Sequence, residues 1–356
     1  MSAVVQEPLP HVHLRRLARA AYIAKAAQML SVTRLVISLT LLGVQTSSDR
    51  RLLVDPIITH SIQLAAVPLV DPKMELDQQL RFVGGWALVS NDEDFGGLSS
   101  LAFNGQTFTG LSDKGLLVRF DWGANNRIKA AKIDPLPKGC AADEFKSDRD
   151  SESIIVDRET GRSWIGFEWR NAICRSGPDG RRAEALVQPT QMRRWARTSG
   201  PEAMVRLSDG RFLVFQERSE QSIVEGEALL YPEDPTLPDT KAARLLIYKP
   251  PAPYFYVTDA AQLPDGRLMV LHRNFKPPFQ FRAKLSIVDK LPGPATNVFQ
   301  GKVLASLSEK GLTDNFEGVA VSQANGHTFI WLVSDDNYQW LQHTYLLQFE
   351  LLNKPG

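Results

Sequence analysis

The chain is poor in the residue types that build the commoner catalytic and metal centres. Its 356 residues include two cysteines and six histidines. The cysteines, Cys140 and Cys174, show no C-x-x-C spacing, so a zinc site built on them is not expected. They would form one disulfide if the protein reaches an oxidising compartment, or stay as two buried thiols, and the sequence leaves both alternatives open.

The chain also lacks an excess of either charge. With 41 basic and 40 acidic residues the net charge is +1. A general nucleic-acid binder usually carries a strong basic excess, so no nucleic-acid partner is expected. A local charged site is still compatible with this balance.

Several catalytic signature sequences are absent. The chain contains no Gly-x-Ser-x-Gly elbow, no P-loop and no dinucleotide fingerprint. These absences argue against a serine esterase built on an α/β sheet. The hydrophobic content of 43% indicates a folded core, and 22 prolines and 24 glycines are spread along the chain, as expected for many short strands.

The N-terminal region reads as a targeting segment. Basic residues precede a ten-residue uncharged run from Leu35 to Val44, which is too short to span a bilayer and is typical of a signal-peptide core. We therefore expect a leader over 1–50, a linker over 51–74, and export to the periplasm or the medium. Met29 would give a compact signal and is a candidate for the true start. The alternative is an uncleaved basic helix that anchors the protein to a membrane surface.

One sequence unit recurs five times between residue 95 and the C-terminus. Each unit has a short strand, a tight turn and a second, more apolar strand. Asn-Gly or Asp-Gly turns, which favour two-residue hairpins, occur at 104–105, 209–210, 265–266 and 325–326. Units of about 50–60 residues with this pattern predict an all-β fold, a β-propeller of about five to six four-stranded blades over 75–356.

The ring must also close on itself. Residues 79–90 read as a strand that completes the sheet holding the C-terminal strands. A sixth, degenerate blade would have to lie within 220–250 or 275–310. A β-sandwich is the alternative fold, but it would not require the acidic repeat described next.

Charged residues recur at two equivalent positions of the repeated units. The first opens the first strand, and its members are Glu152, Glu202, Asp259 and Glu317, with Gly96 in the first unit. The second ends the second strand, and its members are Asp113, Glu168, Glu217 and Asp335, with His272 in the fourth unit. A basic residue often follows, as at Lys114, Arg170, Arg218 and Arg273.

Residues in phase point at the axis of a closed ring, where several carboxylates repel unless they are compensated. Ca²⁺ held by Glu152, Glu202, Asp259 and Glu317 is one solution. A substrate anion held by the four basic residues, with Asp113 and Asp335 beside it, is another. Glu168, Glu217 or His272 would then act as the general base. A Glu–Arg ring that only locks the blades together is the structural alternative.

The chain resembles a known family. The resemblance rests on Phe82-Val83-Gly84-Gly85, Phe95-Gly96-Gly97-Leu98-Ser99, Leu111-Ser112-Asp113, Ser151-Glu152-Ser153-Ile154, Gly200-Pro201-Glu202-Ala203, Asn315-Phe316-Glu317-Gly318-Val319 and Ser334-Asp335-Asp336-Asn337. Together these segments are similar to the phytase-like family, labelled "esterase-like activity of phytase". The resemblance implies a bacterial, usually exported β-propeller that hydrolyses phosphate or other esters with Ca²⁺ support. It supplies no set of catalytic residues.

The sequence therefore predicts an exported propeller hydrolase that acts on a phosphate ester or another small anionic ester, assisted by Ca²⁺. Two other functions stay open, a secreted binding or scaffold propeller without catalysis and a lactonase-type hydrolase.

Overall fold

The computed structural model describes residues 58–70, 72–141, 146–219, 221–277, 280–308 and 311–352. The expected leader over 1–50, including the candidate start at Met29, lies outside these residues. Within the described ranges, no helix has the length and apolar character needed to cross a membrane.

The described strands form five sheets, which are the blades of a propeller. Blade 1 contains, from the inside outward, β5 (Leu98–Phe103), β6 (Thr107–Ser112), β7 (Leu116–Gly123), β8 (Arg127–Pro135) and β1 (His60–Ser61). Blade 2 contains β9 (Ser151–Val156), β10 (Ser163–Phe167), β11 (Ala172–Ser176) and β12 (Ala183–Val187). Blade 3 contains β13 (Pro201–Arg206), β14 (Phe212–Gln216), β15 (Gly226–Tyr231), β16 (Arg244–Lys249) and β20 (Val298–Gln300).

The chain completes two further blades and three short helical turns. Blade 4 contains β17 (Tyr256–Gln262), β18 (Leu268–Lys276), β19 (Gln280–Val288), β21 (Lys302–Leu307) and β3 (Glu75–Leu76). Blade 5 contains β22 (Asn315–Ala324), β23 (His327–Asp335), β24 (Tyr345–Leu351), β4 (Leu80–Val89) and β2 (Ala65–Pro68). The 3₁₀ turns are η1 (Ala124–Asn126), η2 (Lys146–Asp148) and η3 (Met192–Arg194).

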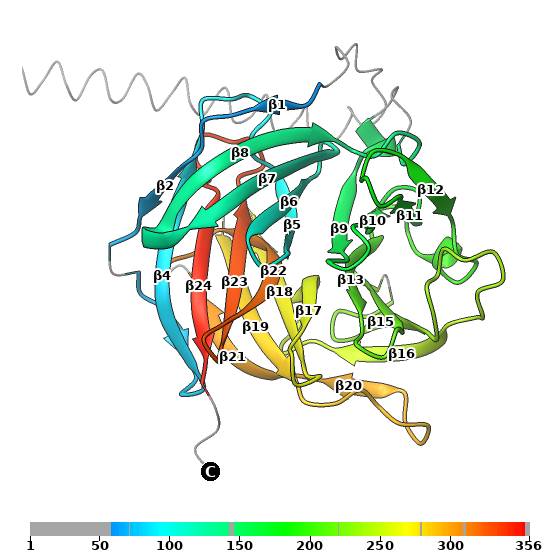
Figure 1. The fold of residues 1–356 in the computed structure, drawn as a ribbon. Helices are drawn as coiled ribbons and strands as arrows, with labels where there is room; N and C mark the ends of the chain where they lie inside the picture. Colours follow the sequence, from blue (N-terminus) through cyan, green and yellow to red (C-terminus); the bar gives the residue numbers. More distant parts are fainter. Residues whose placement is uncertain are drawn as a thin grey trace, which may run out of the picture. The chain divides into compact units, whose positions relative to one another are not determined.

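The innermost strands close a ring. Each of β5, β9, β13, β17 and β22 contacts the inner strand of the blade on either side, and all five surround the centre in Figure 1. The propeller with five blades confirms the predicted fold class. The two segments considered for a sixth blade, 220–250 and 275–310, instead supply outer strands of blades 3 and 4.

The two ends of the propeller chain meet in blade 5. β24 pairs with β4 in antiparallel register, with Leu346 opposite Trp86 and Leu351 opposite Leu80. This is the closing strand that the sequence predicts over 79–90. The structure also extends the propeller into the predicted linker, because β1 and β2 lie on the outer edges of blades 1 and 5. Such edge strands need little beyond backbone pairing, so they leave a weak sequence pattern.

Each interface between blades has its own apolar core. Five buried clusters fill these interfaces, and each draws its residues from two neighbouring blades. The Cys140–Cys174 disulfide belongs to the cluster between blades 1 and 2, with the two Cα atoms 5.4 Å apart. It fastens the segment after β8 to β11, and it decides between the two alternatives for the cysteines.

Candidate functional site

A β-bulge interrupts every inner strand near its start. In blade 3, Pro201 faces Gln216 and Ala203 faces Phe215, so Glu202 has no partner in the ladder. The same shift leaves out one residue in each of the other inner strands, and we call the five residues the inner ring: Ser99, Glu152, Glu202, Thr258 and Glu317. Bulges re-aim a side chain out of the regular pleat, and they are common next to active sites.

The bulges correct the predicted phase in two blades. In blade 4 the inner-ring residue is Thr258, where the comparison of the five units predicted Asp259. In blade 1 it is Ser99, where the comparison predicted Gly96. Asp259 sits one residue later and pairs with Leu271 in the ladder. The spacing from the turns marks the correct position, because Thr258 stands seven residues before Asp265, just as Glu202 stands seven residues before Asp209.

Asp259 ties three blades together instead of joining the inner ring. Its Oδ2 accepts hydrogen bonds from Ser100 Oγ at 3.0 Å, Leu101 N at 3.4 Å and Val319 N at 2.9 Å. Its Oδ1 accepts one from Ala260 N at 2.8 Å. Burial raises the pKa of Asp259 to about 8, and these four hydrogen bonds oppose that effect. With both oxygens used inside the protein, Asp259 has the surroundings of a structural carboxylate and not those of a metal ligand.

A second ring lies where the second strands end. In each blade, the residue just before the bulge pairs with a residue of the second strand. The next residue along the second strand then occupies an equivalent place in all five blades. These five residues form the second ring: Asp113, Glu168, Glu217, Arg273 and Asp335. In blade 4 the position belongs to Arg273, and not to His272 as the sequence alignment had it.

His272 faces away from the rings. The ring is fully buried and stacks on Tyr248, with Nε2 2.7 Å from Tyr248 Oη and Nδ1 3.0 Å from the carbonyl oxygen of Lys284. Burial lowers the pKa of His272 to about 4. Because neighbours in a strand point to opposite faces, His272 packs toward blade 3 while Arg273 turns to the carboxylates. The structure does not bring the predicted base His272 together with Glu168 and Glu217.

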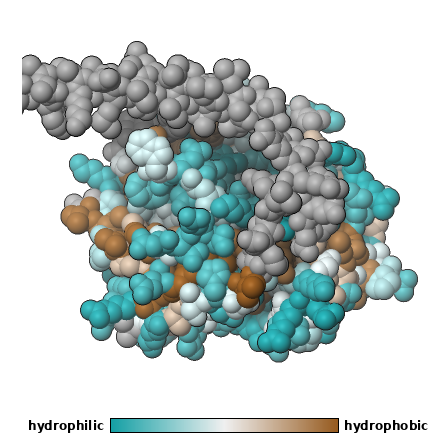
Figure 2. All heavy atoms as spheres, turned by 90° about the horizontal axis from the view of Figure 1, so that it is seen from above, coloured by the Kyte–Doolittle hydropathy of each residue, from teal (hydrophilic) through white to brown (hydrophobic). Residues whose placement is uncertain are grey.

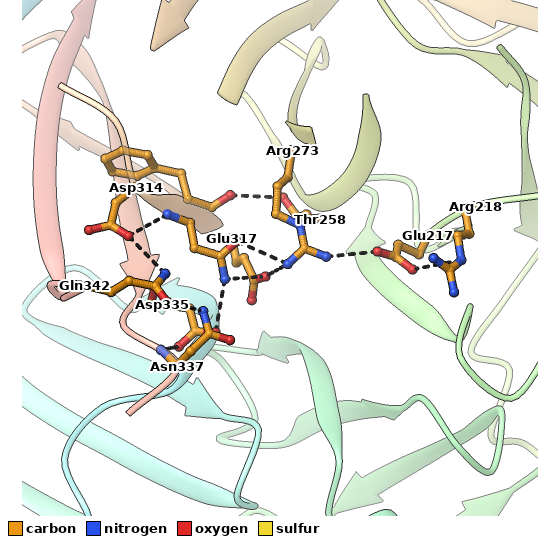
Figure 3. Close-up of polar contacts among 11 residues, drawn as sticks. Glu217, Arg218, Thr258, Arg273, Asp314, Glu317, Asp335, Asn337 and Gln342 are labelled. Atoms are coloured by element: carbon orange, nitrogen blue, oxygen red, sulfur yellow. Dashed lines mark hydrogen bonds and ion pairs between the residues drawn. The ribbon is translucent and has the colours of Figure 1, made fainter. Parts of the chain in front are cut away.

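Arg273 is the cation at the centre of these acids. Its guanidinium donates to Glu217 Oε1 at 2.9 Å, forms an ion pair with Glu317, and donates to Asn315 Oδ1 at 3.1 Å. Figure 3 shows it between the two glutamates, with Arg218 on the far side of Glu217. Burial works against the charge of Arg273, but Glu317 and Glu217 outweigh it and raise the pKa of the guanidinium.

Blade 5 holds the acids on its own side of the site by hydrogen bonds. Asn315 Nδ2 donates to Glu317 Oε1 at 3.0 Å and to Asp335 Oδ2 at 3.2 Å. The backbone N–H of Asn337 donates to Asp335 Oδ1 at 2.6 Å. Burial, followed by the charges of Glu317 and Asp113, raises the pKa of Asp335 well above its ordinary value.

Blades 2 and 3 bring their carboxylates into two overlapping groups. The first contains Asp150, Glu152 and Glu168, and the second contains Glu168, Glu202 and Glu217. Within each group, the oxygen atoms that could bind a metal lie within 4.8 Å of one another. Asp150 lies between η2 and β9. It was not among the predicted site residues, although it stands two residues before Glu152.

The crowding of these acids shifts their protonation. Burial raises the pKa of Glu152 and Glu202 well above the ordinary value, and neighbouring carboxylates add to the effect. Burial and Asp150 raise the pKa of Glu168 to about 8. For Glu317, burial raises the pKa to about 7 although Arg273 opposes it. Such a set of carboxylate oxygens fits a hard cation such as Ca²⁺, whose charge would relieve the repulsion.

The basic residues expected to bind an anion are placed in different ways. Arg170 donates to the backbone oxygens of Cys140 at 2.7 Å and Asp148 at 3.2 Å, so it supports a loop. The Nζ of Lys114 lies 3.2 Å from the centroid of the Tyr338 ring. Arg218 has 45% of its side chain exposed, and its Nε lies 3.8 Å from Glu217 Oε2. Arg218 and Arg273 thus border the acids, whereas Arg170 contacts backbone oxygens and lies over the Phe167 ring, 5.0 Å from its centroid.

Both rings fall within the match to a known family. The model of the phytase-like family, described as "Esterase-like activity of phytase", matches residues 93–338. The chain belongs to this family. As a member of the phytase-like family, it carries every residue of the inner and second rings inside the matched segment.

Other comparisons add similarities of fold. The major allergen Mala s 1 of Malassezia sympodialis is 12% identical, with a TM-score of 0.39, and the alignment covers 83% of this chain and 96% of the allergen. A streptogramin B lyase is 12% identical with a TM-score of 0.33, covering 81% and 97% of the two chains. A luciferin-regenerating enzyme is 9% identical with a TM-score of 0.37, covering 78% and 95%. No curated protein matches the chain.

Proposed function

We propose that this phytase-like propeller hydrolyses a phosphate ester or a similar anionic ester with the help of Ca²⁺. The charge of the two rings is the observation that carries the proposal. Three inner-ring positions and four second-ring positions are carboxylates, and Arg273 is the one basic member. Once its carboxylates are ionised, such a site repels an anionic substrate, and a bound cation would reconcile it with the ester hydrolysis in the family description.

The cation would lie beside Glu168. Glu202 and Glu217 on one side, and Asp150 and Glu152 on the other, are the carboxylates that would hold it. When bound, Ca²⁺ supplies positive charge that polarises the ester and stabilises the charge that develops on its oxygens.

The residues of the chain have separate roles in this proposal. Glu168 is shared by both carboxylate groups and is only partly buried, so it is placed to take a proton from an attacking water. Arg273 fixes the orientation of Glu217 and Glu317 through its two ion pairs. Arg218, exposed at the edge of the site, is placed to contact an anionic group of the substrate.

The disulfide supports the proposal that the protein is exported to the periplasm or secreted. Structural disulfides persist in oxidising compartments and are rare in the cytosol. The Cys140–Cys174 bond is buried in the core between blades 1 and 2, as a structural disulfide would be.

A substrate panel tests the function. Phosphomonoesters, inositol phosphates, carboxylic esters and lactones are assayed with Ca²⁺ and with EDTA, and we expect turnover of a phosphomonoester only with Ca²⁺. Glu202→Gln should lose Ca²⁺ affinity and at least about a hundredfold in kcat/KM while keeping the fold. The matched control is Glu159→Gln, at an exposed turn of blade 2, and it should behave like the wild type.

Two outcomes would change the conclusion. Ca²⁺-dependent binding of these ligands without any turnover would assign a secreted binding propeller instead, and turnover of lactones alone would assign a lactonase. No turnover of any substrate, together with no effect of Ca²⁺ or EDTA on thermal stability, would overturn the proposal.

A further inference from the structure

Four exposed apolar side chains lie on two loops and one strand end of blades 3 and 4, next to the second ring. They are Ile223 and Val224, between β14 and β15, Tyr254, just before β17, and Phe275, near the end of β18. Their exposed fractions are 43%, 46%, 53% and 47%. We call these four residues the apolar rim.

Hydrogen bonds join the three segments of the apolar rim into one surface. The backbone N–H of Tyr254 donates to the carbonyl oxygen of Ile223 at 3.1 Å, and Asn274 Nδ2 donates to the carbonyl oxygen of Tyr254 at 2.9 Å. Phe275 stacks on Phe281, with 4.7 Å between the ring centroids. These contacts hold the side chains in place instead of leaving them on independent loops.

The backbone of Tyr254 shows that its position is enforced. Its φ is +64°, in the left-handed region that a bulky aromatic residue rarely adopts. Strained conformations of this kind persist where the surrounding structure over-determines them, and they cluster at sites that bind ligands.

The apolar rim is continuous with the carboxylates. Glu217 and Arg218 directly precede the loop that carries Ile223, and Arg273 stands two residues before Phe275. Glu217, Ile223 and Tyr256 also line one small cavity of about 10 Å³, which shows that the rim and the second ring are close neighbours but is too small to hold a ligand. Burial raises the pKa of Tyr256, and the charges of Arg218 and Glu217 act on it as well, as expected for close neighbours.

Scattered exposed hydrophobic residues are normal on a protein surface. In the view of Figure 2 the hydrophobic residues form small, separate patches among hydrophilic ones. Four such residues on hydrogen-bonded segments beside a cluster of buried acids are a different case, because apolar walls next to a few polar groups are typical of ligand sites.

We infer that the apolar rim binds the alcohol part of the ester, and that the substrates are monoesters of an alcohol with a large apolar group, either an aromatic ring or a long alkyl chain. This inference rests on the proposed function, which places the anionic group at the carboxylates and their cation. A substrate with an aromatic ring or a long alkyl chain then covers the rim and removes its apolar surface from water. A fully hydrophilic ester, such as an inositol phosphate, leaves the rim exposed to water and gains nothing from it.

Two esters whose leaving alcohols have similar acidity provide the test. We expect kcat/KM for benzyl phosphate to exceed that for ethyl phosphate by about tenfold or more in the wild type, with Ca²⁺ present. Tyr254→Asn, which tolerates a positive φ, and the double variant Ile223→Ser with Val224→Ser should lower the benzyl value about five- to tenfold. Both variants should leave the ethyl value unchanged. The control is Val298→Ser, equally exposed but on the outer strand β20 of blade 3, and it should change neither value.

A binding measurement separates this inference from the proposed function. Calorimetry with benzylphosphonate and ethylphosphonate, in the presence of Ca²⁺, reports on the rim without turnover. If no ester is hydrolysed but the rim variants weaken benzylphosphonate selectively, the rim inference holds and the hydrolase proposal fails. Equal binding of the two phosphonates, or a benzyl preference that survives in both rim variants, overturns the rim inference.

Discussion

The guanidinium of Arg273 donates to Glu217 at 2.9 Å across the boundary between blades 4 and 3. The same group is ion-paired with Glu317 of blade 5, so one side chain links three blades through charge. Arg273 occupies the second-ring position that carries a carboxylate in each of the other four blades. Arg273 is therefore the basic member of the two rings that compensates the carboxylates of two neighbouring blades.

Replacing Arg273 should destabilise the protein strongly. Arg273→Met leaves Glu317 without its cation and leaves Glu217 with only the more exposed Arg218. The loss of one partner of a buried ion pair typically lowers the free energy of unfolding by about 3–5 kcal/mol. Urea unfolding at pH 8 without Ca²⁺ measures this loss. The control is Arg267→Met, which removes an ion pair with the exposed Asp265 and should change stability by less than about 1 kcal/mol. Equal losses in the two variants would contradict the central role of Arg273.

Stability without a bound cation should fall as the pH rises. The pKa of Glu168, about 8, and that of Glu317, about 7, lie above the ordinary value of 4.5, so the folded protein holds protons that the unfolded chain has released. Their contribution is complete below about pH 4.5 and is lost as the pH rises to about 8, which predicts a decrease of about 1–3 kcal/mol.

Thermal melts from pH 5 to pH 8.5 in EDTA would show this decrease. Ca²⁺ binds the ionised carboxylates, so adding it should raise the melting temperature more at pH 8.5 than at pH 5. The double variant Glu168→Gln with Glu317→Gln should give a flatter pH profile. A profile that is already flat in the wild type would count against the raised pKa values.

Substitution of Asp259 should lower the free energy of unfolding, whereas substitution of the ring acid Glu202 should raise it when no metal is present. Asp259→Asn replaces one accepting oxygen by an N–H donor, which then faces a donor such as Ser100 or Val319. A lost or clashing buried hydrogen bond typically lowers the free energy of unfolding by about 1–3 kcal/mol. Glu202→Gln should instead stabilise the protein without metal, because it removes charge from a crowded group. Urea unfolding of both variants in EDTA checks this contrast, and a stabilising Asp259→Asn would contradict it.

Removal of the disulfide should lower stability without moving the site. The bond joins positions separated by 34 residues, a loop for which chain-entropy arguments give about 3–4 kcal/mol. We expect Cys140→Ala with Cys174→Ala to unfold at lower urea concentration than the oxidised wild type. Dithiothreitol should shift the wild type to the same midpoint and leave the variant unaffected. A variant as stable as the oxidised protein would show that the disulfide contributes little.

The blades could be predicted from the sequence because their signals are local. Turn dipeptides such as Asp209-Gly210 and the alternating strands around them depend on neighbouring residues only, and so does the strand over 79–90. The short edge strands β1 and β2 gave no comparable signal, since backbone pairing with a neighbouring strand decides them.

The site was predicted in part, and the two errors in blade 4 have one cause. Glu152, Glu202 and Glu317 were placed in phase because each occupies the bulge of its strand. In blade 4 the residue in the bulge is Thr258, and Asp259, the predicted residue, stands one position later. In the second strand of blade 4, Arg273 occupies the second-ring position for which His272 was predicted. A shift of one residue reverses the face on which a side chain lies. The spacing from the Asp-Gly turn marks the correct positions, because Thr258 and Arg273 stand at the same distances from it as Glu202 and Glu217 do in blade 3.

Because β4 pairs with β24, the ring of blades can close only late in synthesis. Ribosomes deliver β4 first among the main strands of blade 5 and β24 last, so the ring stays open until almost the whole propeller has been synthesised. Until then β4 and β23 both present unpaired edges, which are templates for association with other chains. A chain that stops before Tyr345 cannot supply the strand between them. Chaperone protection of the nascent chain therefore matters most for the blade that contains both ends.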